Sequence, residues 1–147
     1  MGEGLLAVGS EAPVFEAEMQ SGERVSLADF RGASAVVLMF YPKDDTPGCT
    51  AQMCAARDEG AEYAAAGVAR FGVNPDDAES HRGFVARYDL DFPLIVDRDA
   101  AIASAYGVLR EGGGVARATY LIDRDGRIAY AAAGARGAAE ILGSLRG

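Results

Sequence analysis

Residues 41–54, which read YPKDDTPGCTAQMC, mark the passage from a predicted strand into a predicted helix and contain the only two cysteines of the chain. The nearly continuous apolar run 33–41 precedes them, and its Val, Phe and Tyr content is typical of a central strand buried on both faces. Thr46 and Pro47 then predict a helix start, because Thr can cap a helix and Pro suits its first position. Cys49 is therefore expected at a helix N-terminus.

Outward from this stretch, short apolar runs alternate with helical patterns. Residues 14–27 predict a small hairpin. The expected strands are 68–73, 92–96, 117–122 and 127–132. The first expected helix runs from 47 to about 66 and is closed by Gly67, and the second follows the capping signal Asn74-Pro75-Asp76-Asp77. Two more helices are expected over 99–106 and over 137–145, the last with Ile141, Leu142 and Leu145 inward. This order predicts an α/β fold of one domain, residues 1–147, with a central mixed sheet flanked by helices.

Charge and composition narrow the function. A net charge of −8, with 14 basic residues spread singly, argues against nucleic acid and anionic membranes as partners. No stretch approaches the length of a membrane span, and the apolar run 5–8 is too short for a signal-peptide core. The expected location is the cytosol, where thiols stay reduced and a lasting structural disulfide is not expected.

The predicted position of Cys49 favours its thiolate. The first turn of a helix carries the positive end of the helix dipole, and the N–H groups of Gly48 and Cys49 have no partner within the helix. Thiols in such positions ionise more readily, and the thiolate is the reactive species. Because Asp44 and Asp45 oppose ionisation, we expect a cation nearby in space.

Cys54 follows Cys49 by five residues. In an unbroken α-helix this is a rise of about 7.5 Å and a rotation of about 140°, which separates the two Cα atoms by roughly 8–9 Å. A disulfide generally needs Cα atoms within about 7 Å. If both cysteines lie on one helix, they can bond only when that helix locally unwinds.

Other interpretations of the two thiols remain open from the residues alone. Cysteine is often buried simply as a small hydrophobic residue. A metal site needs more ligands than two Cys and one His, and no zinc spacing is present. The spacing C-x-x-x-x-C also differs from the C-x-x-C of thioredoxin-like reductases.

The pattern Pro42-x-x-x-Thr46-x-x-Cys49 resembles the motif of the peroxiredoxins, and the run 41–50 is similar to their bacterioferritin comigratory protein, or Q-type, branch. The resemblance covers most of the chain. It continues in the family's order through 71–76, Ser80-His81, Phe84, 92–94 and 117–123.

The resemblance implies a thioredoxin-like fold and a thiol peroxidase without cofactor or metal. Cys49 matches the peroxidatic cysteine, Thr46 the hydroxyl that orients the peroxide, and Pro42 the proline that shields the pocket. Arg117 matches the arginine that stabilises the thiolate and the O–O bond, and Cys54 a resolving cysteine. The implied catalytic residues are Cys49, Cys54, Thr46 and Arg117, and the implied peroxide-binding residues are Pro42, Thr46, Gly48 and Arg117.

The implied cycle turns Cys49 into a sulfenic acid, condenses it with Cys54, and returns both thiols by exchange with thioredoxin or a similar dithiol. Hydrogen peroxide and organic hydroperoxides are the implied substrates, and a monomer or weak dimer the implied state. Gln52 stands where many members have a Glu that bonds the arginine; Gln can accept the bond but brings no charge. Asn74 stands where Ser is common, and both residues cap helices. For His81, the lone histidine, we expect surface or capping duty.

Two functions from other classes compete with the enzyme. A redox sensor would use the same disulfide switch to alter binding of a partner protein. A chaperone-like holdase would need oligomers and exposed apolar surface, and the acidic sequence shows no sign of either.

Overall fold

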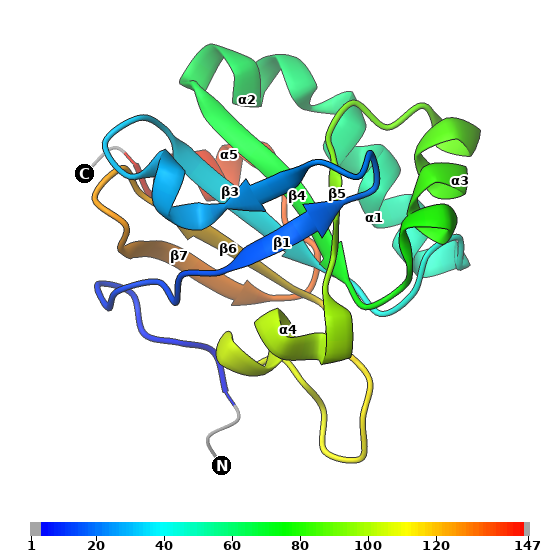
Figure 1. Ribbon diagram of the computed structural model, residues 1–147. Helices are drawn as coiled ribbons and strands as arrows, with labels where there is room; N and C mark the ends of the chain where they lie inside the picture. The colour runs from blue at the N-terminus through cyan, green and yellow to red at the C-terminus, as the bar shows by residue number, and fades with distance from the viewer. Residues whose placement is uncertain (1–3, 146–147) are drawn as a thin grey trace.

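A computed structural model describes residues 4–145 of the chain (Figure 1). Within them lies a seven-stranded sheet of order β2-β1-β5-β4-β3-β6-β7. The strands are β1 Glu16–Met19, β2 Arg24–Ser26, β3 Ala35–Phe40, β4 Val68–Asn74, β5 Leu94–Val96, β6 Ala118–Ile122 and β7 Ile128–Ala133. The helices are α1 Pro47–Asp58, α2 Gly60–Ala66, α3 Ala78–Tyr88, α4 Ala101–Ala105 and α5 Ala138–Gly143, with 3-10 turns at Leu27–Phe30 and Arg98–Ala100.

The sheet is mixed, as the sequence predicts. β3 pairs in parallel with β4 and antiparallel with β6, and β6 continues into the predicted hairpin with β7. The N-terminal hairpin β1–β2 is also confirmed, and it joins the sheet through an antiparallel pairing of β1 with β5. Because β3 is central, the segment that follows it starts from a rigid, buried strand.

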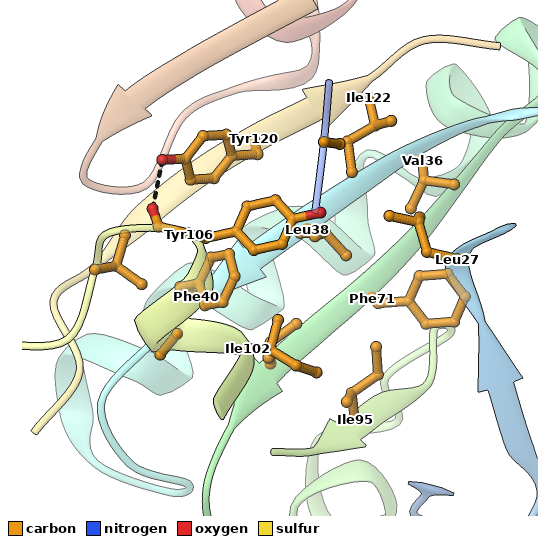
Figure 2. Close-up of a cluster of buried hydrophobic side chains, with 14 of the residues drawn as sticks. Leu27, Val36, Leu38, Phe40, Phe71, Ile95, Ile102, Tyr106, Tyr120 and Ile122 are labelled. Atoms are coloured by element: carbon orange, nitrogen blue, oxygen red, sulfur yellow. Dashed lines mark hydrogen bonds between the residues drawn. The ribbon is translucent and has the colours of Figure 1, made fainter. Parts of the chain in front are cut away.

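The alternation of side chains along β3 divides the interior into two cores. Val36, Leu38 and Phe40 face a cluster built around Tyr106 and Tyr120, in which the Tyr120 hydroxyl donates to the Tyr106 carbonyl at 2.7 Å (Figure 2). α4 lies on that face of the sheet (Figure 1).

The second core lies on the opposite face, under α1, α2, α3 and α5. Val37 and Met39 of β3 face it, together with Cys49 and Met53 of α1. All six residues of β3 are buried, which confirms the prediction of a strand covered on both sides.

The helix predicted to run unbroken to about residue 66 is interrupted at Glu59, which leaves helical geometry with ψ of 13°. Arg70 on β4 accounts for the break, because its guanidinium donates at 2.9 Å to the Ala56 carbonyl, which in a continuous helix would accept from the Gly60 N–H. The same guanidinium pairs with Asp91 at 3.1 Å. Gly60 lies so near this pair that a Cβ there would be 2.3 Å from an Asp91 oxygen. The break is a tertiary effect, whereas the predicted left-handed stop at residue 67 is present.

Two details of the predicted helices need correction. The predicted capping signal 74–77 does precede α3, but the cap within it is Asp77, whose carboxylate accepts from the Ser80 N–H at 2.8 Å; Asn74 does not cap the helix and instead ends β4. In the last helix Ile141 is buried as predicted, but Leu145 lies beyond the helix end and is 38% exposed. Among the described residues no helix is long and apolar enough to cross a membrane.

Candidate active site

The segment between β3 and α1 forms a turn, residues 41–46, that ends at the helix cap. Thr46 is the N-cap residue with extended backbone geometry, and its carbonyl accepts the first helical hydrogen bond from Thr50 at 2.8 Å. Its hydroxyl does not cap the helix as predicted; it donates to the Lys43 carbonyl at 3.0 Å. The N–H groups of Gly48 and Cys49 therefore remain without a partner in the helix.

Cys49 occupies the third position of α1 and is only 1% exposed. Its side chain belongs to the core under α1, α2, α3 and α5, where Tyr41 and Met53 are also buried. The thiol is free. A buried sulfur at a helix N-terminus needs a positive neighbour if it is to ionise.

Arg117 supplies that neighbour. It directly precedes β6, 68 residues from the cysteine, and its Nη1 lies 3.4 Å from Cys49 Sγ. The other terminal nitrogen, Nη2, would be only 3.1 Å from a Cβ added to Gly48. Glycine at position 48 thus leaves the space that the guanidinium occupies.

Gln52 holds the arginine at Nη1, the same nitrogen that approaches the sulfur. It lies one turn after Cys49 on α1, is 7% exposed, and its Oε1 accepts from Arg117 Nη1 at 2.5 Å. Because the amide is neutral, it orients the guanidinium without offsetting its charge. In the part of the chain that the structure describes, Gln52 Nε2 has no hydrogen-bond partner.

Cys54 lies on the same continuous helix, half-buried and also free. Both cysteines belong to α1, and the helix is not interrupted between them. This is the arrangement for which the sequence predicts that a disulfide requires local unwinding. A rotation of about 140° and a rise of about 7.5 Å separate the two residues. A bond between them therefore requires part of α1 to unwind.

The remaining predicted residues lie on the turn before the helix. Pro42 is half-buried at the start of the turn, and Thr46 is half-buried at its end. The structure thus places Pro42, Thr46, Gly48 and Cys49 on one short segment, and it brings Arg117, the residue before β6, to that segment.

Sequence reasoning missed a buried polar cluster beneath the turn. His81 is fully buried, so the expected surface or capping role is wrong. Its Nδ1 lies 2.6 Å from an Asp44 oxygen, and its Nε2 lies 2.9 Å from the Ile95 carbonyl. A signal for this burial was present in the sequence, since His81 lies one helical turn before Phe84 and shares its inward face.

Asp44 and Tyr41 titrate outside their usual ranges in this cluster. Burial alone would raise the pKa of Asp44, but hydrogen bonds from His81 and Tyr41 outweigh it and the pKa is lowered. Burial, followed by the neighbouring Asp44 charge, raises the pKa of Tyr41 well above its ordinary value. Asp44 is therefore a carboxylate and Tyr41 a neutral hydroxyl at physiological pH.

A hollow of about 420 Å³ lies between β1 and α4, and Cys49 does not line it. A groove of about 200 Å³ borders Gln52 on the side of α5. Within residues 4–145 no group of three or more His, Cys, Asp or Glu side chains is arranged to hold a metal ion.

Known proteins resemble this chain over most of its length. The model of the AhpC/TSA family matches residues 8–131. The putative peroxiredoxin bcp of Coxiella burnetii is 39% identical over 130 residues, which are 84% of this chain and 85% of that protein. The chloroplastic peroxiredoxin Q of Triticum aestivum is 41% identical over 129 residues, which are 86% of this chain but 59% of that protein.

Solved structures agree with the sequence matches. The crystal structure of peroxidoxin BcpB from Mycobacterium tuberculosis superimposes with a TM-score of 0.87 at 30% identity, and the match covers 96% of this chain and 97% of that one. The thioredoxin-like fold that the sequence motif implied is thereby confirmed.

Proposed function

This chain belongs to the AhpC/TSA family and is a peroxiredoxin of the Bcp and Q kind, a thiol peroxidase, and from that premise we propose that Cys49 is the residue that attacks peroxide. One observation carries the assignment: the guanidinium of Arg117 lies 3.4 Å from a buried sulfur at the N-terminus of α1. Both features favour the thiolate over the thiol.

In the proposed first step, the Cys49 thiolate attacks one oxygen of the peroxide. The S–O bond forms as the O–O bond breaks, and the electron pair moves to the leaving oxygen, which takes a proton to become water or an alcohol. Arg117 and the unpartnered N–H groups of the helix stabilise the negative charge as it moves from sulfur to oxygen. The product on the enzyme is a sulfenic acid.

The neighbours of Cys49 are proposed to bind and orient the peroxide. The Thr46 hydroxyl donates its hydrogen bond to the Lys43 carbonyl. The lone pairs of its oxygen can therefore accept a hydrogen bond from the hydroxyl group of a peroxide. Gly48 contributes its N–H group and the space for Arg117. Pro42, at the start of the same turn, shields this pocket from water.

Cys54 is proposed to resolve the sulfenic acid. Its thiol condenses with the Cys49 sulfenic acid, which forms the disulfide and releases one water molecule. The two residues lie too far apart in the intact helix, so the first turns of α1 must unwind in every cycle. Because both cysteines belong to one chain, the cycle is complete in a monomer or a weak dimer.

A thioredoxin-type dithiol is proposed to return the enzyme to its reduced form. Unwinding exposes the Cys49–Cys54 disulfide, and exchange with two external thiols transfers the bond to the reductant. The proposed substrates are hydrogen peroxide and small organic hydroperoxides. A reducing compartment such as the cytosol keeps both thiols ready between cycles.

The test is peroxide-dependent consumption of NADPH with thioredoxin and its reductase. Wild type should turn over, Cys49→Ser should not, and Cys54→Ser should react once with peroxide and then stop. Turnover by the Cys49 variant would overturn the assignment of the attacking residue. Full thioredoxin-coupled turnover by the Cys54 variant would overturn only its resolving role, and slow turnover of wild type with an oxidation-dependent binding partner would favour a redox sensor.

A further inference from the structure

The carboxylate of Asp44 is buried and surrounded by donors. The Tyr41 hydroxyl donates to Oδ1 at 2.6 Å and the Asn74 amide at 3.3 Å. The Ser80 hydroxyl donates to Oδ2 at 2.8 Å, and His81 Nδ1 lies 2.6 Å from the same oxygen. Asn74 belongs to β4, and Ser80 and His81 belong to α3, so the middle of the turn 41–46 is attached to two elements distant in sequence.

His81 completes the cluster with both ring nitrogens engaged. Nδ1 faces the Asp44 carboxylate and Nε2 faces the Ile95 carbonyl of β5 at 2.9 Å. A carbonyl only accepts hydrogen bonds, and so does an ionised carboxylate, which the lowered pKa of Asp44 indicates. A neutral imidazole has one unprotonated ring nitrogen, and the lone pair of that nitrogen would face the lone pairs of one of these two oxygens. Only the imidazolium satisfies both contacts.

We propose that His81 is a positioning residue of the peroxidase: as a buried imidazolium held between Asp44 and the Ile95 carbonyl, it fixes the turn 41–46 and thereby the start of α1, where Cys49 lies. The inference rests on the proposed role of Cys49. The N–H groups that stabilise the reacting charge, and the Thr46 hydroxyl that accepts from the peroxide, must be placed precisely, because a misplacement of about 1 Å can cost about 100-fold in rate. The turn 41–46 carries Thr46 and leads directly into the first turn of α1.

The backbone of the turn is held by the same cluster. The Asp44 N–H donates to Asp76 Oδ2 at 2.8 Å. The same Asp76 oxygen accepts from the Asn74 amide at 3.4 Å, and the Asp76 N–H donates to Asn74 Oδ1 at 2.8 Å. If the histidine did not hold the Asp44 side chain, the buried carboxylate would have to move toward water, and the turn would move with it.

The imidazolium also removes an electrostatic obstacle. Three carboxylates lie at or beside the turn, and each has its own cation: Asp44 has His81, Asp45 has Arg87 at 2.7 Å, and Asp76 has Lys43 at 3.7 Å. The acidic residues that precede Cys49 are thus neutralised locally. The charge of Arg117 is left for the cysteine.

Two variants separate the contacts of His81. In His81→Asn the amide nitrogen takes the place of Nδ1 and still donates to Asp44, whereas in His81→Gln it takes the place of Nε2 and reaches only the Ile95 carbonyl. Both variants lose the same ring from the same buried site. A purely structural role therefore lowers the melting temperature and the rate similarly in both.

The rate to compare is that of sulfenic acid formation in a single turnover with hydrogen peroxide, and the melting temperature is recorded in parallel. We expect His81→Asn to remain within about fivefold of wild type and His81→Gln to fall by roughly 10- to 100-fold. Equal rates in the two variants would overturn the positioning role. If wild type itself does not form a sulfenic acid on Cys49, the proposed function has failed instead.

A measurement on wild type keeps the proposal testable should both variants fail to fold. His81 is the sole histidine, so its side-chain nitrogen resonances need no further assignment. At pH 7.5 we expect both ring nitrogens to carry a hydrogen. One protonated and one bare nitrogen would refute the proposal whatever the variants do.

Discussion

Replacement of Arg117 by Met removes the cation at Cys49 while keeping a side chain of similar length. At the observed separation of 3.4 Å between Nη1 and Sγ, the attraction between two unit charges is roughly 5 kcal/mol with an effective dielectric constant of about 20. The arginine is only half-buried, so water offsets much of this attraction. A hydrogen bond to a charged partner retains about 1.5–3 kcal/mol net.

That net energy predicts a loss of roughly 10- to 150-fold in kcat/KM for peroxide, since each 1.36 kcal/mol is about tenfold. The assay is stopped-flow measurement of Cys49 oxidation under pseudo-first-order conditions. Arg110→Met, at an exposed arginine outside the site, is the matched control and should react like wild type. Arg117→Lys should fall between the two, because it keeps the charge but not the planar fork. A folded Arg117→Met variant within twofold of wild type would refute the reasoning.

Three further predictions concern the same site. Cys54→Ser should give one sulfenic acid per chain with peroxide and no thioredoxin-coupled turnover, measured by mass spectrometry after dimedone labelling; continued turnover would contradict it. Gly48→Ala should place a methyl group 3.1 Å from Arg117 Nη2 and lower kcat/KM about tenfold, whereas the melting temperature should barely change. Because the folded state lowers the pKa of Asp44, its contribution to stability is present above the ordinary carboxyl pKa and is lost as pH falls through the lower folded value. Urea unfolding from pH 5 downward should therefore show a smaller pH dependence in Asp44→Asn than in wild type, and equal slopes would contradict the pairing with His81.

The local part of the site could be predicted from the sequence. A buried strand, a turn and Pro47 in the first helical position are all signals within a few residues, and they placed Cys49 correctly at the N-terminus of α1. The spacing to Cys54 likewise follows from helix geometry alone. The capping bond predicted for the Thr46 hydroxyl is absent, because the hydroxyl bonds the nearby Lys43 carbonyl instead of an N–H group of the helix.

The distant contacts could not be derived from residue patterns. Arg117 reaches Cys49 across 68 residues, and only the resemblance to peroxiredoxins nominated it. The break after α1 depends on Arg70 of β4, which no helix signal reveals. The burial of His81 depends on which face of α3 meets the sheet, and its spacing from the buried Phe84 was the one available clue.

The central claim is that the helix carrying both cysteines must open in each catalytic cycle. It is tested most directly by hydrogen exchange of α1 after one equivalent of hydrogen peroxide, with the disulfide identified by mass spectrometry of the same sample. We predict a Cys49–Cys54 bond together with faster exchange in the first turns of Pro47–Asp58, whereas α3 keeps its protection. A Cys49–Cys54 bond in a helix that exchanges as slowly as the reduced one would contradict the account.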